Sequence, residues 1–244
     1  MKAVQSTSAN EGDSAELLFQ FDQIVAGYAD TTVLRGVSGS LQRGQVLAVL
    51  GRNGVGKTTL LRALSGFLPL MQGRIAYAGR DLAHVPPYER LATGIAYSPQ
   101  EDTVFTELSV GENLRLHLST SSLERYQKYF EAFPRLRERL AQRAGSLSGG
   151  ERKLLAFTRT LALNAPLSLI DEPTEGVQPE NIDRMARLIQ ARRAEGAAFV
   201  VVEQNLSFVF DVADHILLLD HGEMVLAGRS SDFTRGDLEE KLAV

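Results

Sequence analysis

The chain has 244 residues, 44% of them hydrophobic and 23% charged, which is ordinary for a globular protein with one sizeable core. Its net charge of −4 argues against a nucleic-acid-binding surface over the whole molecule, so we expect no nucleic acid among its partners. The absence of cysteine excludes disulfides and thiolate metal sites and fits a reducing compartment.

The first 16 residues are polar and lack the apolar segment of a secretion signal, so we expect a disordered extension there. We interpret residues 17–244 as a single domain. The longest apolar runs, such as residues 197–202, are too short to cross a bilayer. We therefore expect a cytosolic protein that associates with a membrane only through a partner.

The domain opens with a predicted strand over residues 17–25, and Tyr28 follows on an expected loop. An aromatic side chain just ahead of a phosphate-binding loop can stack on adenine, and such stacking is worth about 1–3 kcal/mol. Taken alone, a tyrosine in this position is more often a half-buried strand residue. Both interpretations stay open at this point.

Residues 51–58 match G-x-x-x-x-G-K-[ST], the phosphate-binding loop of nucleoside triphosphatases. The apolar residues 46–50 predict a buried parallel strand before it, and residues 59–66 predict a helix after it. This context disfavours an ordinary glycine-rich turn, because glycines and a helix N-terminus can bind phosphate through backbone N–H groups. The predicted site comprises Gly51, Arg52, Asn53, Gly54, Val55, Gly56, Lys57, Thr58 and Thr59, with Lys57 on the β- and γ-phosphates and Thr58 on Mg²⁺.

A further short strand is expected over residues 95–100 and ends at Gln100. A glutamine there is usually a solvated loop residue, and its amide could reach a metal only if this strand lies beside the phosphate loop. From residue 104 to 163 the pattern becomes helical and highly charged, so we predict an inserted helical subdomain over about 101–163.

Ser148, Gly149, Gly150 and Glu151 begin the strongest helix of this segment. Ser148 is a plausible N-cap, and Glu151 three residues later completes a capping box. Two glycines at a helix N-terminus could also form a second phosphate site. The pattern alone does not decide between the two interpretations.

The apolar strand expected over residues 167–170 ends in Asp171 and Glu172. Ligands of parallel α/β sheets bind beyond the carboxyl ends of the strands. Asp171 suits Mg²⁺, directly or through water, and Glu172 could act as general base on an attacking water. An acidic turn is the alternative, which the phosphate loop disfavours. Further strands are predicted over 199–202 and 216–219, with helices over 182–193 and 206–213.

Taken in chain order, these motifs resemble those of the ATP-binding cassette (ABC) proteins over about residues 17–228. They are the phosphate loop, Gln100, the Leu-Ser-Gly-Gly motif at 147–150, Asp171-Glu172 and Gln204. The resemblance implies an α/β phosphate-loop NTPase fold with a mostly parallel core sheet, an N-terminal antiparallel β subdomain and an inserted α-helical subdomain. It implies ATP and Mg²⁺ as cofactors and the following roles: catalysis by Glu172, Gln204 and Lys57, adenine stacking by Tyr28, metal ligation by Thr58, Gln100 and Asp171, and nucleotide contacts from Ser148, Gly149, Gly150 and Glu151.

The same resemblance implies a mechanism. Two such domains close head to tail, each ATP lying between the phosphate loop of one and residues 148–150 of the other. Closure moves helices in transmembrane permease subunits, and hydrolysis reopens the pair. The implied partners are the permease, a second ABC ATPase subunit in a heterodimer or homodimer, and, indirectly, a solute-binding protein. The protein would then be peripheral on the inner face of the cell membrane.

Three residues differ from the commonest pattern of the family: Glu151 replaces glutamine, Gln178 replaces aspartate and Gln204 replaces the switch histidine. Because glutamine cannot become cationic at neutral pH, we expect this ATP site to hydrolyse slowly alone and to depend on an asymmetric partner. With these three residues, the sequence resembles the ATP-binding subunits of bacterial branched-chain amino-acid and urea importers. One segment does not match that subfamily: Glu101-Asp102 and Phe105-Thr106 replace Gly-Arg and Phe-Pro where the membrane partner is normally contacted.

Two other functions remain as alternatives. A soluble ABC-type ATPase acting on ribosomes or DNA usually carries two cassettes or a large coiled-coil insertion, whereas this sequence has one phosphate loop. The second alternative is a nucleotide-gated scaffold without meaningful turnover, and Gln204 in place of the switch histidine is the reason to retain it.

Overall fold

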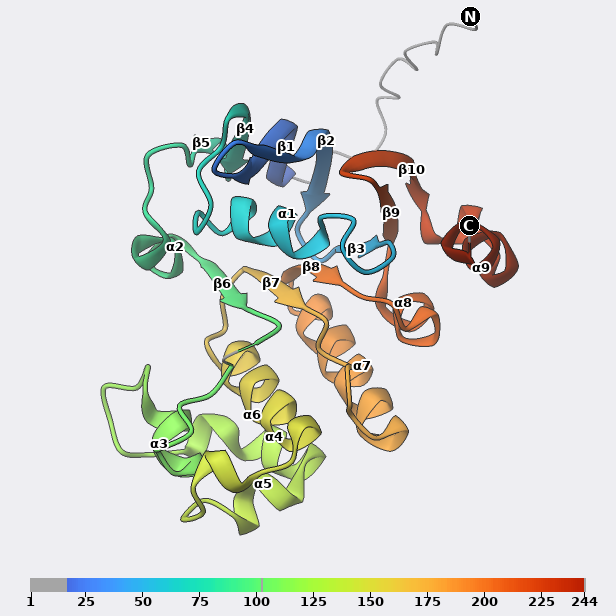
Figure 1. Ribbon diagram of the computed structural model, residues 1–244. Coiled ribbons are helices and arrows are strands. Elements are labelled where there is room, and N and C mark those ends of the chain that lie inside the picture. Colours follow the sequence, from blue (N-terminus) through green and yellow to red (C-terminus); the bar gives the residue numbers. More distant parts are fainter. Residues whose placement is uncertain (1–16, 102, 244) are drawn as a thin grey trace, which may run out of the picture.

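The computed structural model describes residues 17–101 and 103–243. The predicted N-terminal extension, residues 1–16, and Asp102 lie outside the described residues. The strands form two sheets (Figure 1). The order in the first sheet is β2 (Thr31–Gln42), β1 (Leu17–Tyr28), β4 (Gln72–Tyr77) and β5 (Arg80–Asp81), and all its pairs are antiparallel.

The second sheet forms the core of the molecule. Its order is β10 (Glu223–Arg229), β9 (His215–Asp220), β3 (Val46–Leu50), β8 (Ala198–Val202), β7 (Leu167–Asp171) and β6 (Ile95–Ser98). Only the β9–β10 pair is antiparallel; the other neighbours run parallel. Every residue of β3, β7 and β8 is buried, as their nearly continuous apolar sequences require.

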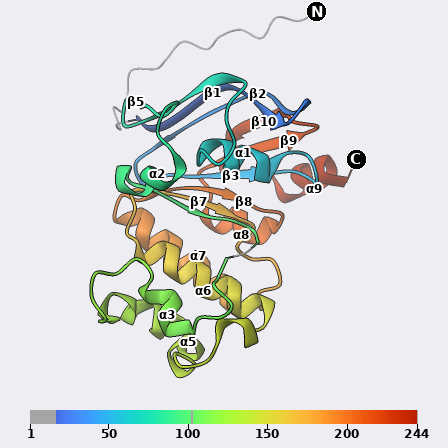
Figure 2. The ribbon, with the colours of Figure 1, turned by 60° about the vertical axis from the view of Figure 1, so that its left-hand side comes forward.

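Helices cover both faces of this core sheet. Helix α1 (Lys57–Leu64) lies between the two sheets, and its Leu60 and Leu61 pack in one cluster with Leu47 and Val49 of β3 (Figure 2). On the opposite face, α6 (Gly149–Ala162) and α7 (Pro179–Ala194) pack against β7 and β8. Three further helices lie at the rim of the sheet: α2 (Pro87–Thr93), α8 (Leu206–Val212) and α9 (Arg235–Ala243).

The segment between β6 and β7 is helical. It contains α3 (Val110–Arg115), α4 (Gln127–Ala132), α5 (Pro134–Glu138) and then α6. Buried aromatic side chains, among them Tyr126, Tyr129 and Phe130, pack in one cluster with the inner face of α6. Figure 2 shows these helices at the end of the molecule farthest from the antiparallel sheet. The predicted α/β architecture with an antiparallel sheet is confirmed, whereas the boundary of a helical subdomain at 101–163 stays a prediction.

The expected loop position of Tyr28 is wrong. Strand β1 continues to Tyr28, which pairs with Thr31 across a two-residue hairpin loop. The left-handed backbone of Ala29 (φ 47°) allows this tight turn. Among the described residues, no helix is both long and apolar enough to span a membrane.

Candidate functional site

The carboxyl ends of β3, β6, β7 and β8 open into one cavity of about 880 Å³. Parallel strands place their ends at one edge of a sheet, which is why residues far apart in sequence meet there. The lining residues are Val33, Asn53, Gly54, Gly56, Lys57, Thr58, Thr59, Gln100, Glu172, Thr174, Glu175, Glu203, Gln204 and Asn205. Half of the sequence-predicted site residues therefore line this cavity.

The loop between β3 and α1 has a backbone that only glycine tolerates at two points. A Cβ on Gly51 would come within 2.5 Å of the Leu219 carbonyl oxygen, and Gly56 has a φ of 109°. Gly56 is also the N-cap of α1 and provides no side-chain hydrogen bond to the first turn. The N–H groups of that turn are thus available to an anion.

The ammonium of Lys57 is held by its own loop. Its Nζ donates to the carbonyl oxygens of Gly51 at 2.8 Å and Arg52 at 2.9 Å. The same Nζ lies 3.5 Å from Oε1 of Glu172, and Lys57 is only 5% exposed. A buried lysine is thereby charge-compensated at the floor of the cavity.

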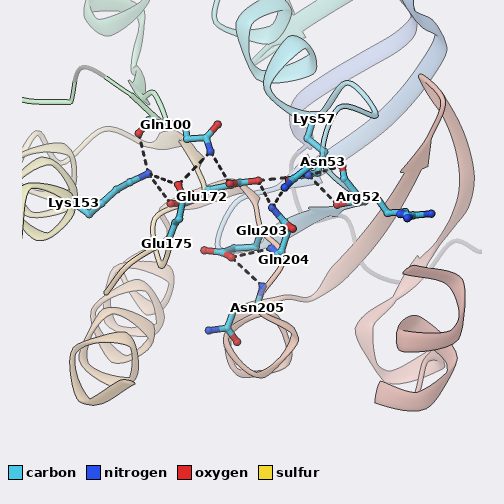
Figure 3. Close-up of polar contacts among 11 residues, drawn as sticks. Arg52, Asn53, Lys57, Gln100, Lys153, Glu172, Glu175, Glu203, Gln204 and Asn205 are labelled. Atoms are coloured by element: carbon cyan, nitrogen blue, oxygen red, sulfur yellow. Dashed lines mark hydrogen bonds and ion pairs between the residues drawn. The ribbon is translucent and has the colours of Figure 1, made fainter. Parts of the chain in front are cut away.

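The carboxylate of Glu172 is hydrogen-bonded on both oxygens (Figure 3). Gln204 Nε2 donates to Oε1 and Gln100 Nε2 donates to Oε2, each at 2.8 Å. Gln204 Nε2 also donates to Oδ1 of Asn53 in the phosphate loop at 2.8 Å. The ends of three strands and the phosphate loop are therefore joined through one carboxylate.

Asp171 lies beside this network, and Thr58 is near its carboxylate without making a hydrogen bond of normal geometry. Both carboxylate oxygens are buried and accept no hydrogen bond from the described residues. The pKa of Asp171 is raised to about 6, mainly by burial and also by the charge of Glu172, against the opposing effects of the Thr58 hydroxyl, Lys153 and Lys57. Unsatisfied buried carboxylate oxygens are unusual unless a ligand completes them, and hard divalent cations take such oxygens.

Several residues of this region were not predicted, and two of them, Glu203 and Lys153, make the most hydrogen bonds to the site. Glu203 is 2% exposed and accepts hydrogen bonds from the backbone N–H groups of Thr174, Gln204 and Asn205. Burial raises the pKa of Glu203 despite these bonds. Its position directly after the apolar strand β8 could have identified Glu203 as a candidate site residue from the sequence. The second, Lys153, contacts Gln100, Glu172 and Glu175 from α6.

Ser148, Gly149, Gly150 and Glu151 line a different cavity, of about 630 Å³, which shares no residue with the first. Ser148 is the N-cap of α6, and its Oγ accepts from the Glu151 N–H at 3.3 Å. Oε2 of Glu151 in turn accepts from the Ser148 N–H at 3.0 Å. The capping box is present, and a role in binding nucleotide stays a prediction. Gln178 lines the same cavity.

Tyr28 is not brought into the nucleotide cavity. Its side chain lies at the end of β1, is 43% exposed, and its hydroxyl accepts a hydrogen bond from Arg62 Nη1 at 3.3 Å. Val33, from the neighbouring strand β2, lines the cavity instead. Adenine stacking by Tyr28 stays a prediction.

Comparison with known families matches residues 34–175 to the ABC transporter family. A high-affinity branched-chain amino-acid transport ATP-binding protein of Pseudomonas aeruginosa is 36% identical over 213 residues, 86% of this chain and 91% of the relative. A probable branched-chain amino-acid transport ATP-binding protein of Archaeoglobus fulgidus is 33% identical over 224 residues, 90% of this chain and 95% of the relative. Among solved structures, an ATP-binding subunit of an ABC transporter superposes with a TM-score of 0.81 at 26% identity, covering 93% of this chain and all of that chain.

Proposed function

Because this chain belongs to the ABC transporter family and carries its ATPase domain, we propose that it is the ATP-hydrolysing subunit of an importer for branched-chain amino acids, urea or related small amides. The observation that carries the proposal is the single cavity in which Lys57, Thr58 and Glu172 meet beside Asp171. The names of the two relatives, both of branched-chain amino-acid transport, support the substrate class.

The phosphate loop and Lys57 bind the triphosphate in this proposal. The free N–H groups at the start of α1 contact phosphate oxygens, and Lys57 exchanges its carbonyl partners for the β- and γ-phosphates. Glu172 accepts the proton of the attacking water at a carboxylate oxygen, while the amides of Gln100 and Gln204 hold that carboxylate in place.

The unpartnered oxygens of Asp171 fit Mg²⁺, and Thr58 and Gln100 are the neighbouring candidate ligands. When bound there, the ion would supply positive charge that neutralises the negative charge developing on the phosphates. The described residues contain no cluster of three or more His, Cys, Asp or Glu side chains for a metal. The donors Asp171, Thr58 and Gln100 suit Mg²⁺, which is usually held by one or two carboxylates together with phosphates and waters.

An exposed apolar groove supports a permease as partner. Phe67, Tyr88 and Leu91 line a cavity of about 700 Å³, and Phe67 and Tyr88 are 62% and 81% exposed. Exposed aromatic side chains grouped in this way are typical of protein interfaces. Gln100 and Glu101 line the same groove, so a partner segment bound there would contact the residue that also holds Glu172.

The separate cavity at Ser148 supports a second ATPase subunit. Since it shares no residue with the cavity at Lys57, a nucleotide bound to the phosphate loop reaches a Ser148 most simply on another chain. The importer would then contain permease subunits, this ATPase and a second ATPase, with a solute-binding protein outside the membrane. This chain would lie on the inner face of the cell membrane.

The test is to tag the chain in its native host, extract membranes in mild detergent and identify the copurifying proteins by mass spectrometry. We expect two hydrophobic permease subunits and a second, different cassette ATPase, and substrate uptake by that system can then be measured. Ribosomal or DNA-repair proteins, with the chain absent from membranes, would show that the transport proposal is wrong and that the soluble alternative holds.

A Glu172→Gln variant tests the catalytic part of the proposal in the same preparation. We expect it to retain ATP binding and to lose nearly all turnover, because the amide cannot accept a proton. Unchanged phosphate release would remove Glu172 from the role of general base. Absence of turnover in the wild-type complex would favour the nucleotide-gated scaffold.

A further inference from the structure

The helix that begins at Ser148 sends one lysine back into the catalytic site. We propose that Lys153 of α6 is a positioning residue for ATP hydrolysis, which fixes the main chain at Glu172 and Gln100 relative to the Ser148 end of the helix. The inference rests on the proposed ATPase function and adds to it a residue that does not itself line the nucleotide cavity.

The contacts of the Lys153 ammonium carry the inference. Its Nζ donates to the carbonyl oxygen of Gln100 at 2.9 Å and to that of Glu172 at 3.1 Å. It also lies 3.4 Å from Oε2 of Glu175. The lysine side chain is only 14% exposed, and Figure 3 shows it reaching across from α6 to the two loops. One cation thus joins three segments: α6, the loop after β6 and the loop after β7.

Glu172 needs such an anchor because its backbone is strained. It has a φ of 43°, a left-handed conformation that L-residues other than glycine rarely adopt. Strained backbone persists only where the surroundings hold it on several sides. The N–H of Glu172 donates to the Val202 carbonyl at 2.9 Å, and its carbonyl oxygen accepts from Lys153. The main chain of the proposed general base is therefore held at both its donor and its acceptor.

Gln100 is held at both ends by the same group of residues. Lys153 binds its carbonyl oxygen, while its Nε2 donates to Glu172 at 2.8 Å and to Oε2 of Glu175 at 3.2 Å. Glu175 is 59% exposed, and an ion pair with so exposed a carboxylate contributes little by itself. The two shorter bonds to backbone carbonyls are the contacts that position the site, because losing the donor would leave two partly buried acceptors unsatisfied.

The position of Lys153 along α6 connects the two cavities. It follows Ser148 by five residues, or about 7.5 Å of helix. The first turn of α6 lines the Ser148 cavity, and Lys153 in the next turn holds Glu172. Any displacement of the first turn, such as contact with a nucleotide on another subunit, is transmitted to the general base through a short rigid element.

The experiment compares Lys153→Met, Lys153→Arg and Lys128→Met in the full chain, in its purified complex. Lys128 is a matched control on α4, 45% exposed and 3.6 Å from Glu195. Single-turnover hydrolysis at saturating MgATP gives the rate, and a fluorescent ATP analogue gives the binding affinity. Hydrogen–deuterium exchange of residues 171–176 reports the anchoring without any need for turnover.

We expect Lys153→Met to lower the hydrolysis rate about 10- to 100-fold, since misplacement of a catalytic group by about 1 Å has effects of this size. Nucleotide affinity should stay within about twofold of wild type. Exchange at residues 171–176 should rise, Lys153→Arg should recover part of the rate through its retained charge and donors, and Lys128→Met should match wild type in every measurement.

A wild-type rate in Lys153→Met would overturn the inference, and so would a loss of affinity as large as the loss of rate. Unchanged exchange at residues 171–176 would also contradict it. If the wild-type complex itself fails to hydrolyse ATP, the proposed ATPase function is wrong, whereas the exchange measurement still decides whether Lys153 anchors the Glu172 loop.

Discussion

At the scale of single residues, the amide of Gln204 occupies the position from which a side chain can contact both the phosphate loop and the general base. Its Nε2 donates to Asn53 and to Glu172, each at 2.8 Å. An amide offers these hydrogen bonds without positive charge, whereas an imidazole can become cationic near neutral pH. The side chain at this position therefore determines how much charge faces the γ-phosphate.

From this we predict that Gln204→His raises the single-turnover rate of ATP hydrolysis, by about tenfold for a gain of about 1.4 kcal/mol in transition-state stabilisation. The exposed Gln20 of β1, changed to His, serves as the control. Rapid-quench measurement of phosphate release gives both rates. A Gln204→His rate equal to wild type would mean that the missing charge does not limit turnover.

At Asp171, by contrast, a charge is present, and its burial lowers the free energy of unfolding of the chain. Its pKa is about 6 rather than the ordinary 3.8, because burial disfavours the ionised form. Below pH 3.8 the carboxyl is protonated in both the folded and the unfolded chain, and the cost is absent. As the pH rises from 3.8 through 6, the unfolded chain ionises first, so the folded state loses stability.

We therefore predict that Asp171→Asn stabilises the nucleotide-free chain by up to about 3 kcal/mol at pH 7, given about 1.4 kcal/mol per pKa unit. Urea unfolding measures the gain, which should disappear near pH 3.5. Asp183→Asn, on the surface of α7, is the control and should change little. The stabilised Asp171 variant should lose MgATP hydrolysis. A destabilised variant at pH 7 would show that burial of Asp171 is already compensated.

At the scale of elements, the start of α6 packs tightly against the loop that follows β7. A Cβ on Gly150 would come within 2.4 Å of the Gly176 carbonyl oxygen, whereas a Cβ on Gly149 would meet nothing within 4 Å. The two adjacent glycines thus have different structural roles. Gly150 permits close packing of α6 against the loop, whereas Gly149 leaves open space in the cavity at Ser148.

The pair gives a matched prediction. Gly150→Ala should destabilise the fold by about 1–3 kcal/mol, because backbone must move to admit the methyl group. Gly149→Ala should keep or slightly increase stability, since alanine favours a helix. Thermal unfolding of the two variants checks this, and equal midpoints would contradict the packing argument.

Some elements and site residues could be predicted from the sequence, and others could not. The buried strands β3, β7 and β8, with polar residues at their carboxyl ends, were predictable because burial on both faces leaves a continuous apolar run. The site residues at those ends followed from the strands. Lys153 was not found, because a charged residue on a helix resembles a solvated one until its partners are known. Those partners, Glu172 and Gln100, lie 19 and 53 positions away.

Tyr28 was misplaced for a related reason. Whether β1 stops at residue 25 or continues to residue 28 depends on its pairing with β2, not on its own residues. The hairpin directs the tyrosine hydroxyl to Arg62 of α1. Local pattern alone could not predict that contact.

At the scale of the whole molecule, the residues expected to contact ATP are divided between two cavities, one at Lys57 and one at Ser148. We predict that a Glu172→Gln chain associates with a second copy or with its partner ATPase only when MgATP is present, because the γ-phosphate then gains donors from both chains. Light scattering with and without MgATP measures this. Gly149→Arg in the same background is the control: its Cβ meets no atom within 4 Å, and the long charged side chain should block the contact. Persistent monomers in the presence of both partner ATPase and MgATP would contradict the prediction.

The strand order of the core sheet also bears on biosynthesis. Strand β3, which leads into the phosphate loop, has as its neighbours β8 and β9, so residues 46–50 pair only with residues made some 150 positions later. Contacts of such long sequence separation form late, and parallel pairing is slow. During translation the phosphate loop is therefore exposed long before its strand is enclosed. Until β8 and β9 have been made, β3 lacks both of its neighbours in the sheet, and an apolar strand without its neighbours is prone to aggregate.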